Sequence, residues 1–271
     1  MNYRKIGFIG AGNMAAALAK SIVSTGLPAD HLLFSDISNE RTVSLCSALG
    51  AHSCLDNIEL AENSDIIFLA VKPNVLGEVI DEIKAYVYQK LIVSIVGGFT
   101  VEALNSAFGG CAKILRIMPN TPALVGEGMF AFSSETTFSS QDIDYIKSLL
   151  KSAGRIEVVE DQYLNAVTGL SGSGPAFAYL FIEALADGGV QQGLPRSLAY
   201  ELAAQTVLGA AKMVLETKES PGSLKDAVCS PGGTTIEGVF ALEKNAFRGA
   251  CMEAVRAASE KSRELSLKAG R

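Results

Sequence analysis

Short apolar runs and amphipathic segments alternate along the first 160 residues of the chain. The runs have the length of buried strands, and the segments between them carry apolar residues at helical spacing, as Met14, Leu18 and Ile22 do. Such alternation predicts a parallel sheet with helices on both faces. We expect strands at Ile6–Ile9, Leu32–Ser35, Asp65–Val71, Leu91–Val96, Ala112–Met118, Gly128–Phe132 and Arg155–Val159. We expect helices at Met14–Val23, Asn39–Leu49 and Gln141–Ser152, a helix that follows the strand Asp65–Val71 and ends at about Tyr86, and a short helix capped by Thr100.

From residue 161 onward the strand pattern disappears and alanine-rich helices remain. A chain of 271 residues is long enough for two domains with separate cores. We therefore predict an α/β domain at residues 1–160 and an all-α domain at residues 161–271. Its helices are expected at Pro175–Val190, Pro195–Thr217, Leu224–Val228, Thr235–Lys244 and Ala246–Lys268.

The first predicted strand runs directly into Gly10-Ala-Gly-Asn-Met-Ala15, a Gly-x-Gly-x-x-Ala sequence. In this pattern Gly10 permits a tight turn, Gly12 lets a pyrophosphate approach the backbone, and Ala15 lets the helix pack closely. The helix then directs free N–H groups and its positive dipole end at the anion. A purely structural turn is the alternative, but the strand–turn–helix context favours dinucleotide binding. We predict a Rossmann-type doubly wound sheet for the first domain.

The predicted helix Pro195–Thr217 is apolar around much of its circumference. A helical domain of this size can bury one stripe within itself but hardly every face. We therefore expect a homodimer through the helical domain, the alternative being the central helix of a monomeric bundle. One stripe holds Leu198, Leu202, Thr206, Gly209 and Met213, and the other holds Ala199, Ala203, Val207, Ala210 and Val214.

Composition narrows the classes of partner. The net charge is −6 and the chain has no basic block, which argues against nucleic acid and acidic membrane surfaces. No apolar run approaches the length of a transmembrane helix, and glycines interrupt the first apolar stretch, so we expect neither a membrane anchor nor a signal peptide. The five cysteines form no Cys-x-x-Cys pair, which indicates reduced thiols in a cytoplasmic protein.

The end of the second predicted strand offers opposite signals about the cofactor. An acidic residue there usually binds the adenosine ribose and selects NAD, whereas a nearby arginine accommodates the additional phosphate of NADP. The chain has Asp36 and Arg41, with hydroxyls at Ser35 and Ser38. Alternatively, Asp36 is a turn residue and Arg41 a solvated side chain. The preference stays open.

Two further strand ends belong to the same edge of the predicted sheet. Ala70-Val71-Lys72-Pro73 follows one strand, and Val96-Gly97 ends the next. Ligands of doubly wound sheets lie across the carboxyl ends of the strands, so these residues are candidates for cofactor contact. Lys72 is a possible base, but a lysine in this place more often pairs with ribose or phosphate. Ordinary strand-to-helix loops are the alternative.

Two glycine-rich segments of the helical half immediately precede predicted helices. They are Gly169-Leu-Ser-Gly-Ser-Gly-Pro-Ala176 and Ser230-Pro-Gly-Gly-Thr-Thr235. Each is expected to present unpaired N–H groups and hydroxyls to a carboxylate. A helix cap with tight packing would explain either one alone, but two beside a nucleotide-binding fold suggest a small anionic substrate.

The residues that are missing also bear on the chemistry. The chain has two histidines, His31 at the start of the second strand and His52 in a predicted peripheral turn, and neither accompanies a glycine-rich loop. We find no paired carboxylates, no metal-ligand spacing and no Gly-x-Ser-x-Gly sequence. Carbonyl reduction normally needs a protein acid, whereas an imine arrives protonated. The inventory therefore favours reduction of a C=N bond.

Seven segments, spread in order over nearly the whole chain, resemble the pyrroline-5-carboxylate reductase family. The last of them is highly specific, whereas the first is shared by many dehydrogenases. The segments are Ile6–Met14, Ala70–Pro73, Met118-Pro-Asn-Thr-Pro122, Gly169–Ala176, Ala184-Leu-Ala-Asp-Gly-Gly189, Gly209-Ala-Ala-Lys-Met213 and Leu224-Lys-Asp-Ala-Val-Cys-Ser-Pro-Gly-Gly-Thr-Thr-Ile236.

The resemblance implies reduction of 1-pyrroline-5-carboxylate to L-proline, the last step of proline biosynthesis, with NADPH or NADH. It also implies a homodimer of interlocked helical domains, often built into a larger ring, and no metal. No catalytic side chain is assigned, and Thr235 is expected to orient the substrate. The implied cofactor residues are Gly10, Gly12, Asn13, Met14, Ser35, Asn57, Ala70, Val71, Lys72 and Pro73, and the implied substrate residues are Ser173, Ser230, Gly233, Thr234 and Thr235.

Two alternatives remain at this stage. A β-hydroxyacid dehydrogenase-like oxidoreductase would have a lysine four residues after Gly174, but Ala178 stands there, and Ile182 replaces the asparagine that follows. The general acid of that reaction is therefore missing. A non-catalytic NADP-sensing protein would not need the carboxylate loop Ser230–Thr235.

Overall fold

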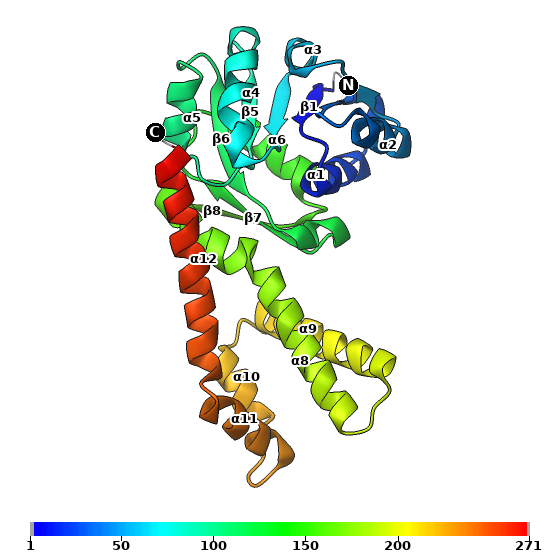
Figure 1. The fold of residues 1–271 in the computed structure, drawn as a ribbon, viewed down its shortest axis with the longest axis vertical. Coiled ribbons are helices and arrows are strands. Elements are labelled where there is room, and N and C mark those ends of the chain that lie inside the picture. Colours follow the sequence, from blue (N-terminus) through cyan, green and yellow to red (C-terminus); the bar gives the residue numbers. More distant parts are fainter. Residues whose placement is uncertain (1–2, 270–271) are drawn as a thin grey trace. The chain divides into compact units, whose positions relative to one another are not determined.

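The computed structural model describes residues 3–269 and contains two compact units. Figure 1 shows the sheet of the first unit in blue to green. Its strands lie in the order β3-β2-β1-β4-β5-β6-β7-β8, and each described pair is parallel except β6 with β7. The strands are β1 (Ile6–Ile9), β2 (Leu32–Ser35), β3 (His52–Ser53), β4 (Ile66–Leu69), β5 (Leu91–Ser94), β6 (Lys113–Met118), β7 (Gly128–Ser133) and β8 (Gly154–Val159).

Of the described helices in the first unit, five follow the predicted pattern and two were not predicted. Ser38, Thr100 and Ser139 cap three of them, each accepting a hydrogen bond from a backbone N–H of the first turn. The helices are α1 (Asn13–Ser24), α2 (Asn39–Leu49), α3 (Asn57–Asn63), α4 (Leu76–Ile83), α5 (Val101–Ala107), α6 (Ser140–Leu150) and α7 (Leu164–Val167). The two that were not predicted are α3 and α7.

Side chains alternate across the sheet and build one core on each face. Ile6 and Phe8 of β1 belong to the core under α1, α2 and α6, whereas Ile9 belongs to the core under α3, α4 and α5. Phe8 pairs in register with Phe34 and Phe68, and their rings stack at 5.1 and 4.8 Å. The predicted doubly wound sheet with helices on both faces is confirmed.

The structure differs from the prediction in several details. The sheet is mixed, because β7 turns back against β6. His52 lies in the edge strand β3 and not in a turn, and the helix α3 was not predicted. Both elements carry few apolar residues: β3 is exposed, and α3 buries Leu60 and Ala61. A hydrophobic pattern has little to detect in such elements.

The two compact units do not divide at residue 160. The first unit ends at Ser173 and includes the chain again from Ala257, and the second unit is Gly174–Arg256. Asp161 explains part of this difference: its Oδ2 lies 3.1 Å from Nη1 of Arg116 on β6, and both side chains are buried. Asn165 accepts hydrogen bonds from Ser262 and Ser266. The functional boundary at residue 160 stays a prediction.

The helices beyond residue 173 leave much apolar surface exposed. Ala199 and Ala203 pack against Ala186, so one of the two predicted stripes is partly buried. Leu202 on the other stripe is 49% exposed, and Leu208 is 52% exposed. Among the described residues, no helix is long and apolar enough to cross a membrane. These helices are α8 (Gly174–Gln191), α9 (Arg196–Thr217), α10 (Pro221–Ala227), α11 (Thr234–Lys244) and α12 (Phe247–Ala269), which ends in the first unit.

Candidate functional site

The strand order reverses between β1 and β4, and the glycine-rich turn lies at this point. The chain builds β1, β2 and β3 toward one edge, then returns to place β4 on the other side of β1. Ligands of doubly wound sheets bind at such a switch point, beyond the carboxyl ends of the strands. Gly10 follows β1 there and Ala70 follows β4, and the N–H of Ala70 donates to the carbonyl of Ile9 over 2.8 Å.

Gly10 and Gly12 serve different purposes. Gly10 has φ +102°, and a Cβ placed on it would lie 2.5 Å from the carbonyl oxygen of Ala70, so this glycine is required by the fold itself. Gly12 has an ordinary extended backbone, and a Cβ there would meet nothing within 4 Å. It is the N-cap of α1 and offers no side-chain cap to the first N–H groups. Open space before an uncapped helix fits a pyrophosphate.

Asp36 is directed at the glycine-rich turn. Its Oδ2 accepts the N–H of Ala11 over 2.8 Å, and its Oδ1 accepts the N–H of Ser38 over 2.9 Å. Nη1 of Arg41 lies 3.9 Å from Oδ2, and the Arg41 side chain is 60% exposed. Asp36 therefore braces the turn against the end of β2. Both of its carboxylate oxygens accept hydrogen bonds from the backbone. Asp36 is thus a turn residue, which is one of the two possibilities that the sequence left open.

Ser35, the last residue of β2, is buried and bonded to Asn57. Its hydroxyl donates to Oδ1 of Asn57 over 2.8 Å. Nδ2 of Asn57, the first residue of α3, donates over 2.7 Å to Oε2 of Glu82 on α4. The structure thus joins two sequence-predicted cofactor residues directly. It adds Glu82, which the sequence did not indicate.

The other predicted cofactor residues also lie at the carboxyl ends of strands. Lys72 is exposed and is the N-cap of a short 3₁₀ turn that begins at Pro73. Val96 is buried after β5, and Gly97 follows it. A Cβ on Gly98 would lie 3.6 Å from the backbone of Leu265, so the last turns of α12 lie against this loop. Asn13 and Met14 begin α1.

The first of the two predicted carboxylate segments is not a loop. Thr168–Gly172 forms a π-helical turn that continues α7 toward α8, and the N–H of Ser173 donates to the carbonyl of Thr168 over 2.8 Å. The prediction of unpaired N–H groups here is wrong for Ser173, because the π turn uses this donor. Such turns often occur at functional sites, and the hydroxyl of Ser173 stays a candidate.

Asn120 fixes this turn to the sheet. Its Nδ2 donates to the carbonyl oxygen of Ser171 over 3.2 Å and lies 3.3 Å from the Ser171 hydroxyl. Its Oδ1 accepts the N–H of Met129 on β7 over 2.8 Å. Neither Asn120 nor the Arg116–Asp161 pair was assigned from the sequence. The family-like segment Met118–Pro122 contained the only signal for Asn120, and nothing in the sequence pairs Arg116 with Asp161.

The second predicted carboxylate segment precedes a helix as expected, but one of its N–H groups, that of Gly233, is already paired. Ser230–Gly233 precedes α11, the N–H of Gly233 donates to the carbonyl of Ser230 over 3.0 Å, and Gly232 has φ +66°. Gly233 is the N-cap and provides no side-chain acceptor for the first turn. Thr234 and Thr235 are exposed and begin the helix. The arrangement offers hydroxyls and helix N–H groups to an anion.

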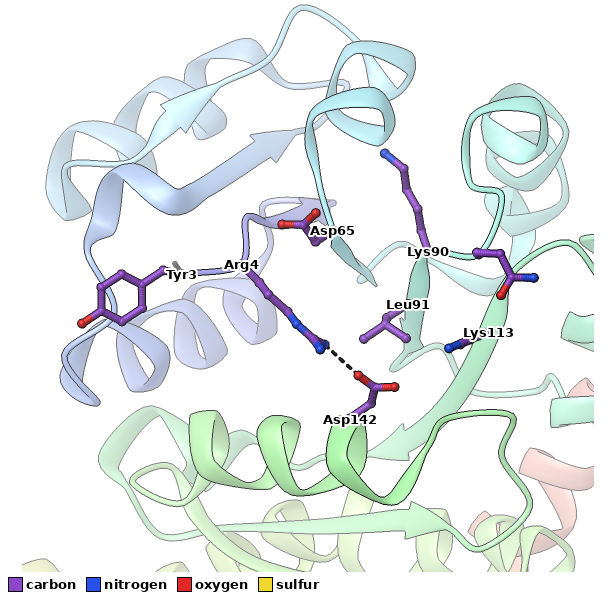
Figure 2. A pocket seen from close by; sticks show the side chains of 8 residues that line it. Tyr3, Arg4, Asp65, Lys90, Leu91, Lys113 and Asp142 are labelled. Carbon is purple, nitrogen blue, oxygen red and sulfur yellow. Dashed lines mark hydrogen bonds and ion pairs between the residues drawn. The ribbon is translucent and has the colours of Figure 1, made fainter. Parts of the chain in front are cut away.

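A crevice at the amino ends of strands β1, β4, β5 and β6 is lined by charged side chains (Figure 2). Arg4 lies 2.8 Å from Asp142 at the start of α6, and Lys90 donates over 2.9 Å to the carbonyl of Glu62. Burial would raise the pKa of Asp142, but hydrogen bonds from Ser139 and Arg4 outweigh it and lower that pKa. The Arg4–Asp142 pair ties the residue before β1 to α6, and Lys90 bonds to the last turn of α3.

The fold and the switch-point turn define a dinucleotide-dependent oxidoreductase with an added helical region. Residues 5–98 match the family model described as "NADP oxidoreductase coenzyme F420-dependent". Residues 161–265 match the model described as "Pyrroline-5-carboxylate reductase dimerisation".

Relatives extend the match to nearly the full chain. The pyrroline-5-carboxylate reductase of Escherichia coli (strain K12) is 43% identical over 266 residues, covering 97% of this chain and 98% of that protein. The enzyme of Arabidopsis thaliana is 44% identical over 264 residues, covering 97% and 95%. A crystal structure of Plasmodium falciparum pyrroline carboxylate reductase with NADP bound is 39% identical, with a TM-score of 0.89 and coverage of 98% and 99%. The chain belongs to the pyrroline-5-carboxylate reductase family.

Proposed function

We propose that this protein reduces the cyclic imine 1-pyrroline-5-carboxylate to L-proline with NADPH, and that NADH also serves. Identity above 40% to named reductases over nearly the full chain supports this reaction, and the open backbone at Gly12 supports the cofactor. The five cysteines are free thiols, consistent with a cytosolic enzyme.

A reduced nicotinamide bound here would supply the hydride that converts the protonated imine of the substrate into the amine of proline. The residues of the chain then have to bind the cofactor and the substrate and orient them toward each other. We assign the pyrophosphate to Gly12 and the α1 terminus, the ribose region to Ser35 and Asn57, and the substrate carboxylate to the turn before α11 with Thr235. No protein acid is required, because the iminium form already carries its proton.

A direct assay tests the reaction. Oxidation of NADPH and of NADH is followed by absorbance with 1-pyrroline-5-carboxylate, and formation of proline is measured in the same samples. A 3-hydroxy acid with NADP serves as the competing substrate. We expect turnover of the imine and none of the hydroxy acid. The reverse pattern would indicate a β-hydroxyacid dehydrogenase, and tight NADPH binding without turnover of the imine would indicate a sensor.

We also propose that the exposed face of α9 forms a subunit interface in a dimer or a larger ring. Leu198, Leu202 and Met213 lie on one stripe of α9 and are 42%, 49% and 50% exposed, and contiguous apolar patches of this kind mark association sites. Light scattering at micromolar concentration should give at least twice the chain mass of 28.5 kDa. Leu202→Glu should lower the mass, whereas Lys212→Glu, at an exposed polar position, should not. A wild-type monomer would refute the proposal.

A further inference from the structure

Glu82 is an exposed carboxylate of α4 that reaches the end of β2 through two hydrogen bonds. It accepts from Nδ2 of Asn57 over 2.7 Å, and Oδ1 of Asn57 accepts from the Ser35 hydroxyl over 2.8 Å. In a doubly wound sheet the end of the second strand holds the adenosine ribose and any 2′-phosphate. Glu82 therefore acts on the part of the site where NADPH and NADH differ.

The carboxylate determines which way the Asn57 amide faces. A carboxylate only accepts hydrogen bonds, so the amide nitrogen turns to Glu82 and the amide oxygen is left for Ser35. The hydroxyl proton of Ser35 is then directed at Asn57. A 2′-phosphate also only accepts, and it needs these donors. Turning the amide around would set its oxygen against the carboxylate of Glu82, acceptor against acceptor.

Charge works in the same direction. Glu82 bonds to Asn57, Asp36 lies at the end of β2, and Asp56 caps α3 directly before Asn57. The cation Arg41 lies 3.9 Å from Asp36 and is largely exposed. The 2′-phosphate of NADPH would add about two negative charges to this region. A ribose hydroxyl brings none and can donate to an acceptor. The bonded chain Ser35–Asn57–Glu82 therefore suits a hydroxyl better than a phosphate.

We propose that Glu82 is a positioning residue that acts through Asn57. It lowers the preference for NADPH over NADH, which would be stronger if Ser35, Asn57 and Arg41 acted without it. This proposal rests on the proposed function, because it places a nicotinamide dinucleotide at the switch point between β1 and β4. It assigns to α4 a role in cofactor selection that neither the glycine-rich turn nor Asp36 supplies.

The test compares dissociation constants for NADPH and NADH, measured by titration without imine. Glu82→Gln removes the charge, keeps the size and lets Asn57 turn its nitrogen to an incoming phosphate. We expect the affinity ratio of NADPH to NADH to rise about three- to fivefold, mainly through tighter NADPH binding. Adenosine 2′,5′-bisphosphate should gain over 5′-AMP by a similar factor. Glu82→Asp keeps the charge but shortens the reach to Asn57, and should change the ratio less.

Asp81→Asn is the matched control, because it removes the same charge from the same turn of α4 where the carboxylate pairs with Lys84. Its ratio should stay at the wild-type value. An unchanged ratio in Glu82→Gln, a shift toward NADH, or an equal shift in Asp81→Asn would overturn the inference. Imine turnover by the wild type is measured separately: if turnover is absent while the ratio shifts as expected, the proposed reaction fails and the role of Glu82 stands.

Discussion

Gly12→Val is expected to abolish dinucleotide binding while the protein stays folded. A Cβ at this position meets nothing within 4 Å, and the backbone is in an extended conformation that valine adopts readily. The added methyl groups would instead occupy the space before the α1 terminus, where the pyrophosphate is assigned. We expect calorimetric titration to show NADPH affinity reduced more than about 100-fold, equivalent to about 2.8 kcal/mol.

Two companion variants separate this effect from folding. Gly10→Ala forces a positive φ on a residue with a Cβ and sets that Cβ 2.5 Å from the Ala70 carbonyl oxygen, so it should lower the melting temperature. Gly222→Val makes the same substitution in α10, where a Cβ would lie 3.7 Å from Oγ of Ser220. This variant should bind NADPH normally. Unchanged NADPH affinity in Gly12→Val would remove the basis for the cofactor assignment.

Sequence pattern predicted those parts of the fold that burial and local signals control. The strand around Phe8 alternates between two cores, and Thr100 caps its helix by a contact within one turn. Both signals are local, so the alternation and the cap were readable from the sequence. The edge strand at His52 pairs with β2 but is two residues long and exposed, so it buries no apolar side chain that a hydrophobic pattern could detect. That strand was therefore missed.

The sequence indicated candidate site residues but not their contacts. Gly12 and Ser35 are candidates because turn chemistry and position at the end of a strand single them out. The direction of the Asp36 carboxylate depends on the N–H of Ala11, and the Asn57 amide depends on Glu82. Arg116 pairs with Asp161 across 45 residues of sequence. Such pairings follow from the tertiary arrangement, and one sequence cannot specify them.

Thr235→Ala should raise the KM for the imine about ten- to a hundredfold while the KM for NADPH changes only a few-fold. Thr235 lies exposed in the first turn of α11, beyond an N-cap that has no side chain to offer. Losing a hydrogen bond to a charged group costs about 1.5–3 kcal/mol, which corresponds to this range. The carboxylate keeps its charge during hydride transfer, so the loss should fall on substrate binding more than on kcat.

Steady-state kinetics with both substrates varied provide the measurement. Thr217→Ala makes the same change at an exposed helix end where the hydroxyl bonds to its own helix, and should leave both KM values unaltered. Thr235→Ser should restore most of the imine affinity. His31 lies before β2 against Tyr3, and His52 lies in the exposed edge strand, so alanine at either should keep kcat within a few-fold. If a histidine variant lost most of kcat while Thr235→Ala behaved normally, both the helix-terminus carboxylate site and reduction without a protein acid would be wrong.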